Sequence, residues 1–280
     1  MKIDGKEISQ LIFEELKEKV GKLKLLNITP RLYILLLTDD PSTKSYVNQK
    51  SLKSQLIGTE ITVEKVNSKI KTRDLLQKIN KLNKDSTIHG IIVQRPVPSQ
   101  VNEKDISRAI AEEKDIDGFR PNSIFGIPVA LAVFEILQNI KNQTSNFENL
   151  TLKEWLNGKK ITVIGNGLTA GGPIIRSFNN LGLEPEVIIS KTKNKKEILK
   201  NSDIIISAVG KANVVDNTMI KKGVILISVG MHKEKDGKFH GDYDEKNIEN
   251  TASFYTPTPG GVGPLNVAML LKNLVQAAGK

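Results

Sequence analysis

The chain has 280 residues, enough for about two domains that each bury a core. It contains no cysteine and three scattered histidines, which excludes disulfides and cysteine nucleophiles and disfavours a metal enzyme. The net charge is +10, but the lysines are spread along the whole sequence, so we expect a solvated surface and no nucleic-acid partner. No apolar run approaches the ~18 residues of a membrane span, and the N-terminus is charged. We therefore expect a cytoplasmic protein with no membrane partner.

In the first half, strand and helix patterns alternate. Amphipathic spacing predicts a helix that Gly21 ends, and a second helix that Ser42 caps and that runs to about Ile57. A third helix is expected over 72–83. The strands expected at 31–38 and 89–94 are continuous apolar runs, typical of strands covered on both faces, and a further strand is expected at 60–66. This alternation indicates a parallel sheet with right-handed crossovers.

The second half begins with a long apolar helix, expected over 123–140. The polar stretch 141–148 follows as a candidate hinge or surface insertion. The strand–helix pattern then restarts, with strands expected at 160–164, 186–190, 203–209 and 224–229, helices up to 181 and over 193–200, and a last helix over 263–279. This second part looks like a doubly wound, Rossmann-like dinucleotide-binding fold.

A glycine-rich loop, Gly165-Asn166-Gly167 and onward to Gly171, lies between a strand and a helix. Glycines there let the backbone approach a pyrophosphate at a helix N-terminus, although tight turns also contain such glycines. The next strand ends in Ser190 and Lys191, where an NAD site usually presents a carboxylate. The sequence therefore favours NADP, and a basic loop in a basic protein is the alternative.

Ser42, Tyr46 and Lys50 lie four residues apart, so they share one face of the predicted helix. Gln94 ends a buried strand, and its side chain is expected at the same edge of the sheet. These residues indicate a ligand site, while a polar solvent-facing surface remains the alternative.

The segment Asp115-Ile116-Asp117-Gly118 is a turn by composition. One aspartate could cap the next helix, and the other could bind a guanidine-like group. The proline- and glycine-rich stretch 256–264 imposes a rigid path between a strand and the last helix.

Together these motifs resemble bifunctional methylenetetrahydrofolate dehydrogenase/methenyltetrahydrofolate cyclohydrolase. The matching segments follow the family order and cover nearly the whole chain: 39–50 (DDPSTKSYVNQK), 90–98 (GIIVQRPVP), 113–119 (EKDIDGF), 165–173, 207–211 (SAVGK), 223–230 (GVILISVG) and 256–270 (TPTPGGVGPLNVAML). The resemblance implies an α/β protein with two domains flanking a cleft. It also implies oxidation of 5,10-methylenetetrahydrofolate with NADP and hydrolysis to 10-formyltetrahydrofolate, a step of one-carbon metabolism that serves purine biosynthesis.

The resemblance also implies the domain bounds and the roles of residues. A folate-binding catalytic domain would span 1–122, completed by the helix over 264–280, and an NADP domain would span 123–263. Lys50 would be the catalytic lysine, Gln94 its hydrogen-bond partner, Tyr46 the residue that stacks on the folate, and Asp117 the acceptor for the pterin donors. The cofactor positions would be Gly165, Asn166, Gly167, Ser190 and Met231, with Lys191 adding charge. A homodimer is expected.

Some positions depart from the family pattern. Asn166 and Gly167 replace an arginine and a serine that are usual in the loop, so NAD is not excluded. Arg95 stands where an apolar residue is usual, and Pro128-Val129-Ala130-Leu131 replaces a P-C-T-P segment. The alternatives are a folate- or nucleotide-binding relative that has lost one or both activities, and another two-domain NAD(P)-dependent dehydrogenase.

Overall fold

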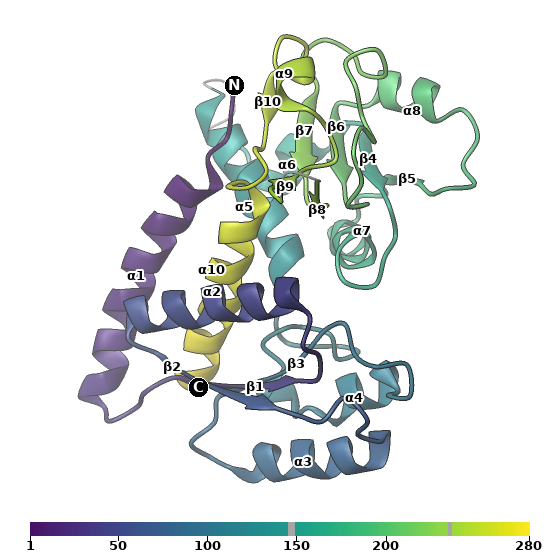
Figure 1. Cartoon of the computed structure of the whole chain (residues 1–280). Coiled ribbons are helices and arrows are strands. Elements are labelled where there is room, and N and C mark those ends of the chain that lie inside the picture. Colours follow the sequence, from purple (N-terminus) through teal and green to yellow (C-terminus); the bar gives the residue numbers. More distant parts are fainter. Residues whose placement is uncertain (145–148, 235–236) are drawn as a thin grey trace. The chain divides into compact units, whose positions relative to one another are not determined.

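The computed structural model describes residues 1–144, 149–234 and 237–280, which form two compact units (Figure 1). The three-strand unit comprises Gln10–Pro128 and Val267–Lys280, and the five-strand unit comprises Met1–Ser9 and Val129–Asn266. The main sheet of each unit is parallel throughout, which confirms a fold of two α/β domains with parallel sheets. The cleft and the domain bounds at 122 and 263 stay predictions.

The sheet of the three-strand unit has the order β2-β1-β3. Its strands are β1 Arg31–Leu36, β2 Glu60–Lys65 and β3 Gly90–Gln94. The helices that contribute to this unit are α1 Gly5–Leu25, α2 Pro41–Ile57, α3 Thr72–Lys84, α4 Glu103–Ala109, the short η1 Glu112–Lys114 and α10 Val262–Ala278. Helices α1 and α10 begin in the five-strand unit and end in this one.

The two faces of this sheet meet different helices. Val93 of β3 packs in one cluster with Leu75 of α3 and Ile106 of α4. Successive side chains of a strand point to opposite faces, so Gln94 points to the other face. Figure 1 shows α2 on that other side of the sheet. The end of β3 therefore presents the Gln94 amide toward α2.

Helix α2 has well-defined ends. Asp40 is the N-cap and accepts a hydrogen bond from the Thr43 backbone N–H at 2.7 Å, with Pro41 in the first turn. Gly58 ends the helix in the left-handed conformation at φ +83°. The prediction that Ser42 caps this helix is wrong by two residues, because the aspartate carboxylate is the stronger acceptor.

Three other expected boundaries are corrected. Gly21 does not end α1, which continues to Leu25, since the buried Leu16 and Val20 offset the ~1 kcal/mol cost of a mid-helix glycine. The helix expected from 123 begins only at Pro128 and runs to Gln143, so it takes up the start of the polar stretch 141–148. Residues 145–148 of that predicted hinge lie outside the described residues.

The parallel sheet of the five-strand unit has the order β10-β7-β6-β4-β5. Its strands are β4 Ile161–Ile164, β5 Glu186–Ile188, β6 Ile204–Ser207, β7 Ile225–Ser228 and β10 Phe254–Tyr255, with a separate hairpin of β8 His232–Lys233 and β9 Phe239–His240. Its helices are α5 Pro128–Gln143, α6 Leu152–Leu156, α7 Gly171–Asn180, α8 Lys195–Asn201 and α9 Glu245–Ile248. In chain order the five strands read 2-1-3-4-5, which places a switch point between β4 and β6.

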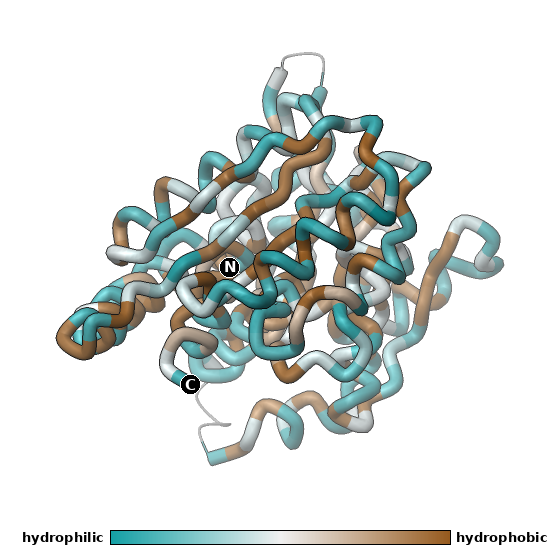
Figure 2. Tube along the Cα trace, turned by 90° about the horizontal axis from the view of Figure 1, so that it is seen from below, coloured by the Kyte–Doolittle hydropathy of each residue, from teal (hydrophilic) through white to brown (hydrophobic). Residues whose placement is uncertain are grey.

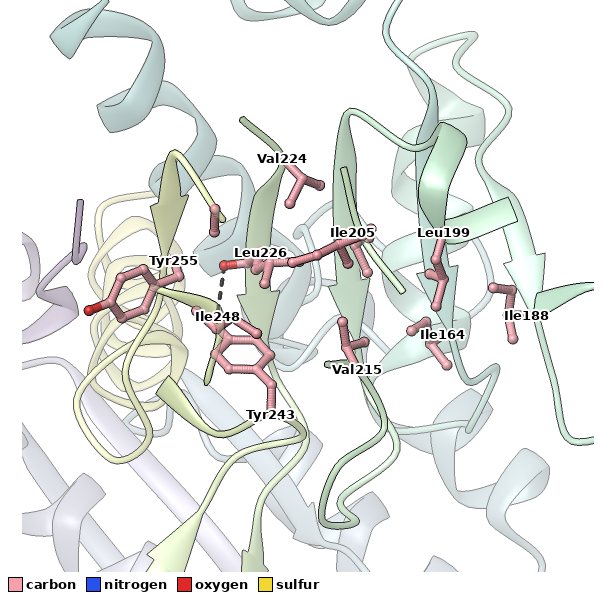
Figure 3. Packing of buried hydrophobic residues seen from close by; sticks show 12 residues of the cluster. Ile164, Ile188, Leu199, Ile205, Val215, Val224, Leu226, Tyr243, Ile248 and Tyr255 are labelled. Carbon is pink, nitrogen blue, oxygen red and sulfur yellow. Dashed lines mark hydrogen bonds between the residues drawn. The ribbon is translucent and has the colours of Figure 1, made fainter. Parts of the chain in front are cut away.

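One face of this sheet carries a continuous apolar core (Figure 3). Ile164, Ile205 and Leu226 lie side by side on neighbouring strands, and Leu199 of α8 and Ile248 of α9 cover them. In Figure 2 the helical segments alternate between apolar and polar residues, as amphipathic helices do. None of the helices in the described parts of the chain is both long and apolar enough to cross a membrane.

Helix α10 also fastens a loop of the three-strand unit. The buried Asn273 side chain donates from Nδ2 to the carbonyls of Ile116 at 2.8 Å and Gly126 at 2.9 Å. Leu274 contacts the position where a Cβ on Gly90 would lie, 3.1 Å away, so β3 passes close under this helix. The loop that carries Asp115 and Asp117 is therefore held by α10.

Candidate active site

The three-strand unit holds a buried lysine beside a buried amide. Lys50 projects from the buried face of α2 and is 3% exposed, and Gln94 ends β3. The Lys50 Nζ donates to Gln94 Oε1 at 2.9 Å, and Gln94 Nε2 donates to the Arg95 carbonyl at 3.0 Å. Because the amide is fixed at both ends, it sets the position of the ammonium.

Two further groups approach Lys50. Its Nζ lies 4.7 Å from the centroid of the Tyr46 ring, one turn earlier on α2. Burial lowers the Lys50 pKa from its usual value, and the negative charge of Asp117 opposes that shift. A lowered pKa raises the fraction of the lysine that is unprotonated at a given pH, which favours a role in general acid–base catalysis.

The structure therefore brings together four predicted residues, Tyr46, Lys50, Gln94 and Asp117, and leaves Ser42 apart. Ser42 is exposed, whereas Lys50 is on the helix face that packs on the sheet. The prediction that Ser42 shares a helix face with Lys50 was wrong. At 3.6 residues per turn, a residue eight positions later does not lie directly above the first, so Lys50 lies on a different side of the helix from Ser42.

Asp115 and Asp117 have different environments. Asp115 is 1% exposed and accepts hydrogen bonds from the backbone N–H groups of Phe119 and Arg120, so its side chain closes a turn and does not cap the next helix, α5, which begins at Pro128. Burial is the main cause that raises the Asp115 pKa to about 6, against the hydrogen bonds that lower it. The Asp117 side chain is 23% exposed and can meet a ligand.

Asp115 predicts a pH dependence of stability. Its pKa is raised in the folded state, so its contribution to the free energy of unfolding is full below about pH 4 and is lost as the pH rises through about 6. The free energy of unfolding should fall by ~3 kcal/mol over this pH range, and Asp115→Asn should abolish this pH dependence. Urea unfolding between pH 4 and 7 measures the slope. Asp74→Asn, an exposed carboxyl on α3, is the matched control, and an equal slope in both variants contradicts the assignment.

The glycine loop of the five-strand unit follows β4. Gly165 has φ +92°, and a Cβ there would lie 2.8 Å from the Ala208 carbonyl oxygen. A Cβ on Gly171, at the start of α7, would overlap the Gly165 carbonyl. A Cβ on Gly167 would meet nothing within 4 Å, so its open side is free to receive a ligand. The loop lies at the switch point between β4 and β6, where doubly wound folds bind nucleotides.

The other predicted cofactor residues lie at the same edge of that sheet. Ser190 and Lys191 are exposed two and three residues after β5, and Met231 is 51% exposed three residues after β7. A Cβ on Gly210, after β6, would lie 3.1 Å from the Met231 carbonyl oxygen, so these two loops are in contact. The loops after β4, β6 and β7 thus form one loop cluster, and the loop after β5 lies at the same edge of the sheet.

A buried carboxylate organises this cluster. Asp242 is fully buried and accepts hydrogen bonds from the backbone N–H groups of Val209, Gly210 and Lys211 at 2.8–2.9 Å, and one from the Ser207 hydroxyl. Its own N–H donates to Ser228 Oγ at 2.9 Å. Asp242 therefore ties the loop after β6 to the end of β7.

Sequence reasoning missed Asp242 because the groups that donate to its carboxylate lie 31–35 residues earlier and form no motif with it. It also missed Lys114, whose Nζ donates to the carbonyls of Leu82, Asn83 and Asp85 at the end of α3. Among the residues that the structure describes, no three His, Cys, Asp or Glu side chains are grouped as a metal site.

A parallel sheet with a glycine loop at its switch point, and a second unit with a buried lysine, define a two-domain nucleotide-dependent α/β enzyme. Residues 3–117 match the family model "Tetrahydrofolate dehydrogenase/cyclohydrolase, catalytic domain", and residues 148–280 match its "NAD(P)-binding domain". The chain belongs to the tetrahydrofolate dehydrogenase/cyclohydrolase family.

Relatives and solved structures agree with this family. The chain is 35% identical to the bifunctional protein FolD of Ligilactobacillus salivarius, covering 99% of this chain and 96% of that one. It is 36% identical to FolD of Halalkalibacterium halodurans, covering 99% and 98%. The crystal structure of FolD from Campylobacter jejuni superposes with a TM-score of 0.91 at 34% identity, covering 100% and 98%. FolD from Trypanosoma brucei, complexed with NADP and an inhibitor, superposes with 0.88 at 27%, covering 100% and 97%.

Proposed function

We propose that this chain oxidises 5,10-methylenetetrahydrofolate to the methenyl form with NADP and then hydrolyses that product to 10-formyltetrahydrofolate. The single observation that carries the proposal is the buried Lys50–Gln94 pair, which lies in the region that matches the family's catalytic domain. The methenyl carbon is already electrophilic, so its hydrolysis needs proton transfer and no metal. A lysine whose pKa burial has lowered provides that transfer.

We assign a role to each side chain of the site. Lys50 exchanges the proton during the addition of water and ring opening, and Gln94 holds its ammonium without adding a charge. Tyr46 stacks on the folate beside Lys50. Asp117 accepts hydrogen bonds from the pterin amino group and ring N–H, because its two oxygens match two adjacent donors.

The loops of the five-strand unit fit a dinucleotide. Close backbone contacts at Gly165 leave no room for a Cβ there, and the open side of Gly167 allows a pyrophosphate to approach. Asn166, Ser190, Lys191 and Met231 would hold the remaining parts of NADP. When bound, the nicotinamide supplies the hydride acceptor.

The domain bounds follow from these roles. Residues 1–122 with 264–280 would form the folate-binding domain, and 123–263 the NADP domain, close to the division of the chain into a three-strand and a five-strand unit. We further propose a cytoplasmic homodimer that binds neither membranes nor nucleic acid. The even spread of lysines along the chain supports the absence of a nucleic-acid site.

A turnover assay with methylenetetrahydrofolate and each nicotinamide cofactor tests the function. We expect both activities and a preference for NADP of about tenfold in kcat/KM, or ~1.4 kcal/mol. The margin is modest because exposed Lys191 is a point charge and replaces an arginine clamp only partly. Raising the salt concentration should shrink it.

The same assay separates the alternatives. Folate binding without turnover identifies a relative that has lost catalysis. Turnover of a hydroxy acid alone identifies another dehydrogenase. Equal or better kcat/KM with NAD at low salt contradicts the NADP assignment and leaves the folate site intact, because that site uses residues of the other unit.

A further inference from the structure

Arg95 is an enclosed arginine directly after the catalytic amide. Its side chain is 14% exposed, and its Nη2 donates to Ser107 Oγ at 2.9 Å. Its Nε lies 3.5 Å from Glu103 Oε2, and its Cζ lies 3.8 Å from the centroid of the Phe119 ring. Two edges and one face of the guanidinium are therefore fixed.

The remaining nitrogen points to Asp117. Arg95 Nη1 lies 4.0 Å from Asp117 Oδ2, within range for an ion pair and too far for a hydrogen bond. The guanidinium thus attracts the carboxylate but leaves its oxygens open to other donors. Phe119 and Asp117 belong to the same loop, so Arg95 contacts this loop through both a ring and a charge.

We propose that Arg95 is a positioning residue that orients Asp117 toward the donor edge of the folate ring and compensates its charge without occupying its acceptor oxygens. The proposal rests on the proposed function of this site. Lysine can replace Arg95 only in part, since a single ammonium cannot contact Ser107 and Glu103 and still stack on Phe119 while facing Asp117. An apolar side chain at residue 95 would leave Asp117 with no cation from the segment that follows β3.

The test measures methenyltetrahydrofolate hydrolysis by the full chain. We expect Arg95→Leu to raise KM about tenfold and to leave kcat within about threefold, because Lys50 and Gln94 remain in place. Arg95→Lys should give an intermediate KM. Arg108→Leu removes an exposed arginine from the same region, at the end of α4, and should leave both constants unchanged.

A double-mutant cycle with Asp117→Asn separates positioning from packing. If Arg95 acts through Asp117, Arg95→Leu should change KM less than twofold once Asp117→Asn is present. The proposal is overturned if the KM of the double variant rises by the product of the two single-variant changes. It is also overturned if Arg95→Leu alone leaves KM unchanged. Should Arg95→Leu not fold, Arg95→Gln keeps a donor for Ser107, loses the charge, and enters the same cycle. A wild-type chain that hydrolyses no methenyltetrahydrofolate contradicts the proposed function instead.

Discussion

Replacing Lys50 with methionine is expected to lower the rate of methenyltetrahydrofolate hydrolysis by about 10²–10⁴-fold, the range that general acid–base catalysis contributes. Methionine fills a similar volume in this buried position but has no proton to exchange and no donor for Gln94 Oε1. Folate binding should remain, since Tyr46 and Asp117 are unchanged. Absorbance of the methenyl form measures hydrolysis, and calorimetry with 5-formyltetrahydrofolate measures binding.

The control for this variant lies one turn further along α2. Lys53→Met removes an ammonium that lies over the Phe13 ring, 5.3 Å from its centroid, and it should leave hydrolysis unchanged. Hydrolysis by Lys50→Met within about tenfold of wild type, a change of ~1.4 kcal/mol in the barrier, would remove Lys50 from the catalytic role.

The second large effect is expected at Asp242. Asp242→Ala leaves three part-buried backbone N–H groups and the buried Ser207 hydroxyl without their acceptor, so the free energy of unfolding should fall by about 3–5 kcal/mol. The loop after β6 loses its shape, so the KM for NADP should rise at least tenfold. Urea unfolding gives the first quantity and steady-state kinetics the second.

Asp244→Ala is the matched control, two residues away. Asp244 is exposed and caps α9 by accepting from the Lys246 N–H, so its loss should cost only ~1 kcal/mol and leave the KM unchanged. Similar losses of stability in both variants would show that Asp242 is an ordinary turn residue.

Much of the fold follows from local patterns, and the error at the end of α1 comes from packing between elements. Continuous apolar runs predicted β1 and β3 within two residues, because strands covered on both faces carry no polar alternation. The end of α1 was missed because packing of Leu16 and Val20 outweighs the cost of Gly21. That packing is not visible in a short window of sequence.

The residues of the candidate site likewise divide into those that local patterns predict and those that they do not. Tyr46 and Lys50 lie on one predicted helix and Gln94 at one predicted strand end, so parallel-sheet geometry was enough to group them. Asp242, Lys114 and the contacts of Arg95 join segments that are distant in sequence, and they became visible only with the packing. Whether the grouped residues carry the assigned roles stays a prediction.

The hydrogen bonds of Asn273 determine when, during synthesis, the loop with Asp117 can reach its final structure. The loop with Asp117 is held by hydrogen bonds from Asn273, which is synthesised 157 positions after Ile116. By then the whole five-strand unit has been translated. During synthesis, the five-strand unit can therefore fold before the loop with Asp117 is held in place. A chain stopped at residue 266 should accordingly bind NADP and fail to bind 5-formyltetrahydrofolate, which calorimetry can measure. The folate site can therefore bind its ligand only after α10 has been synthesised.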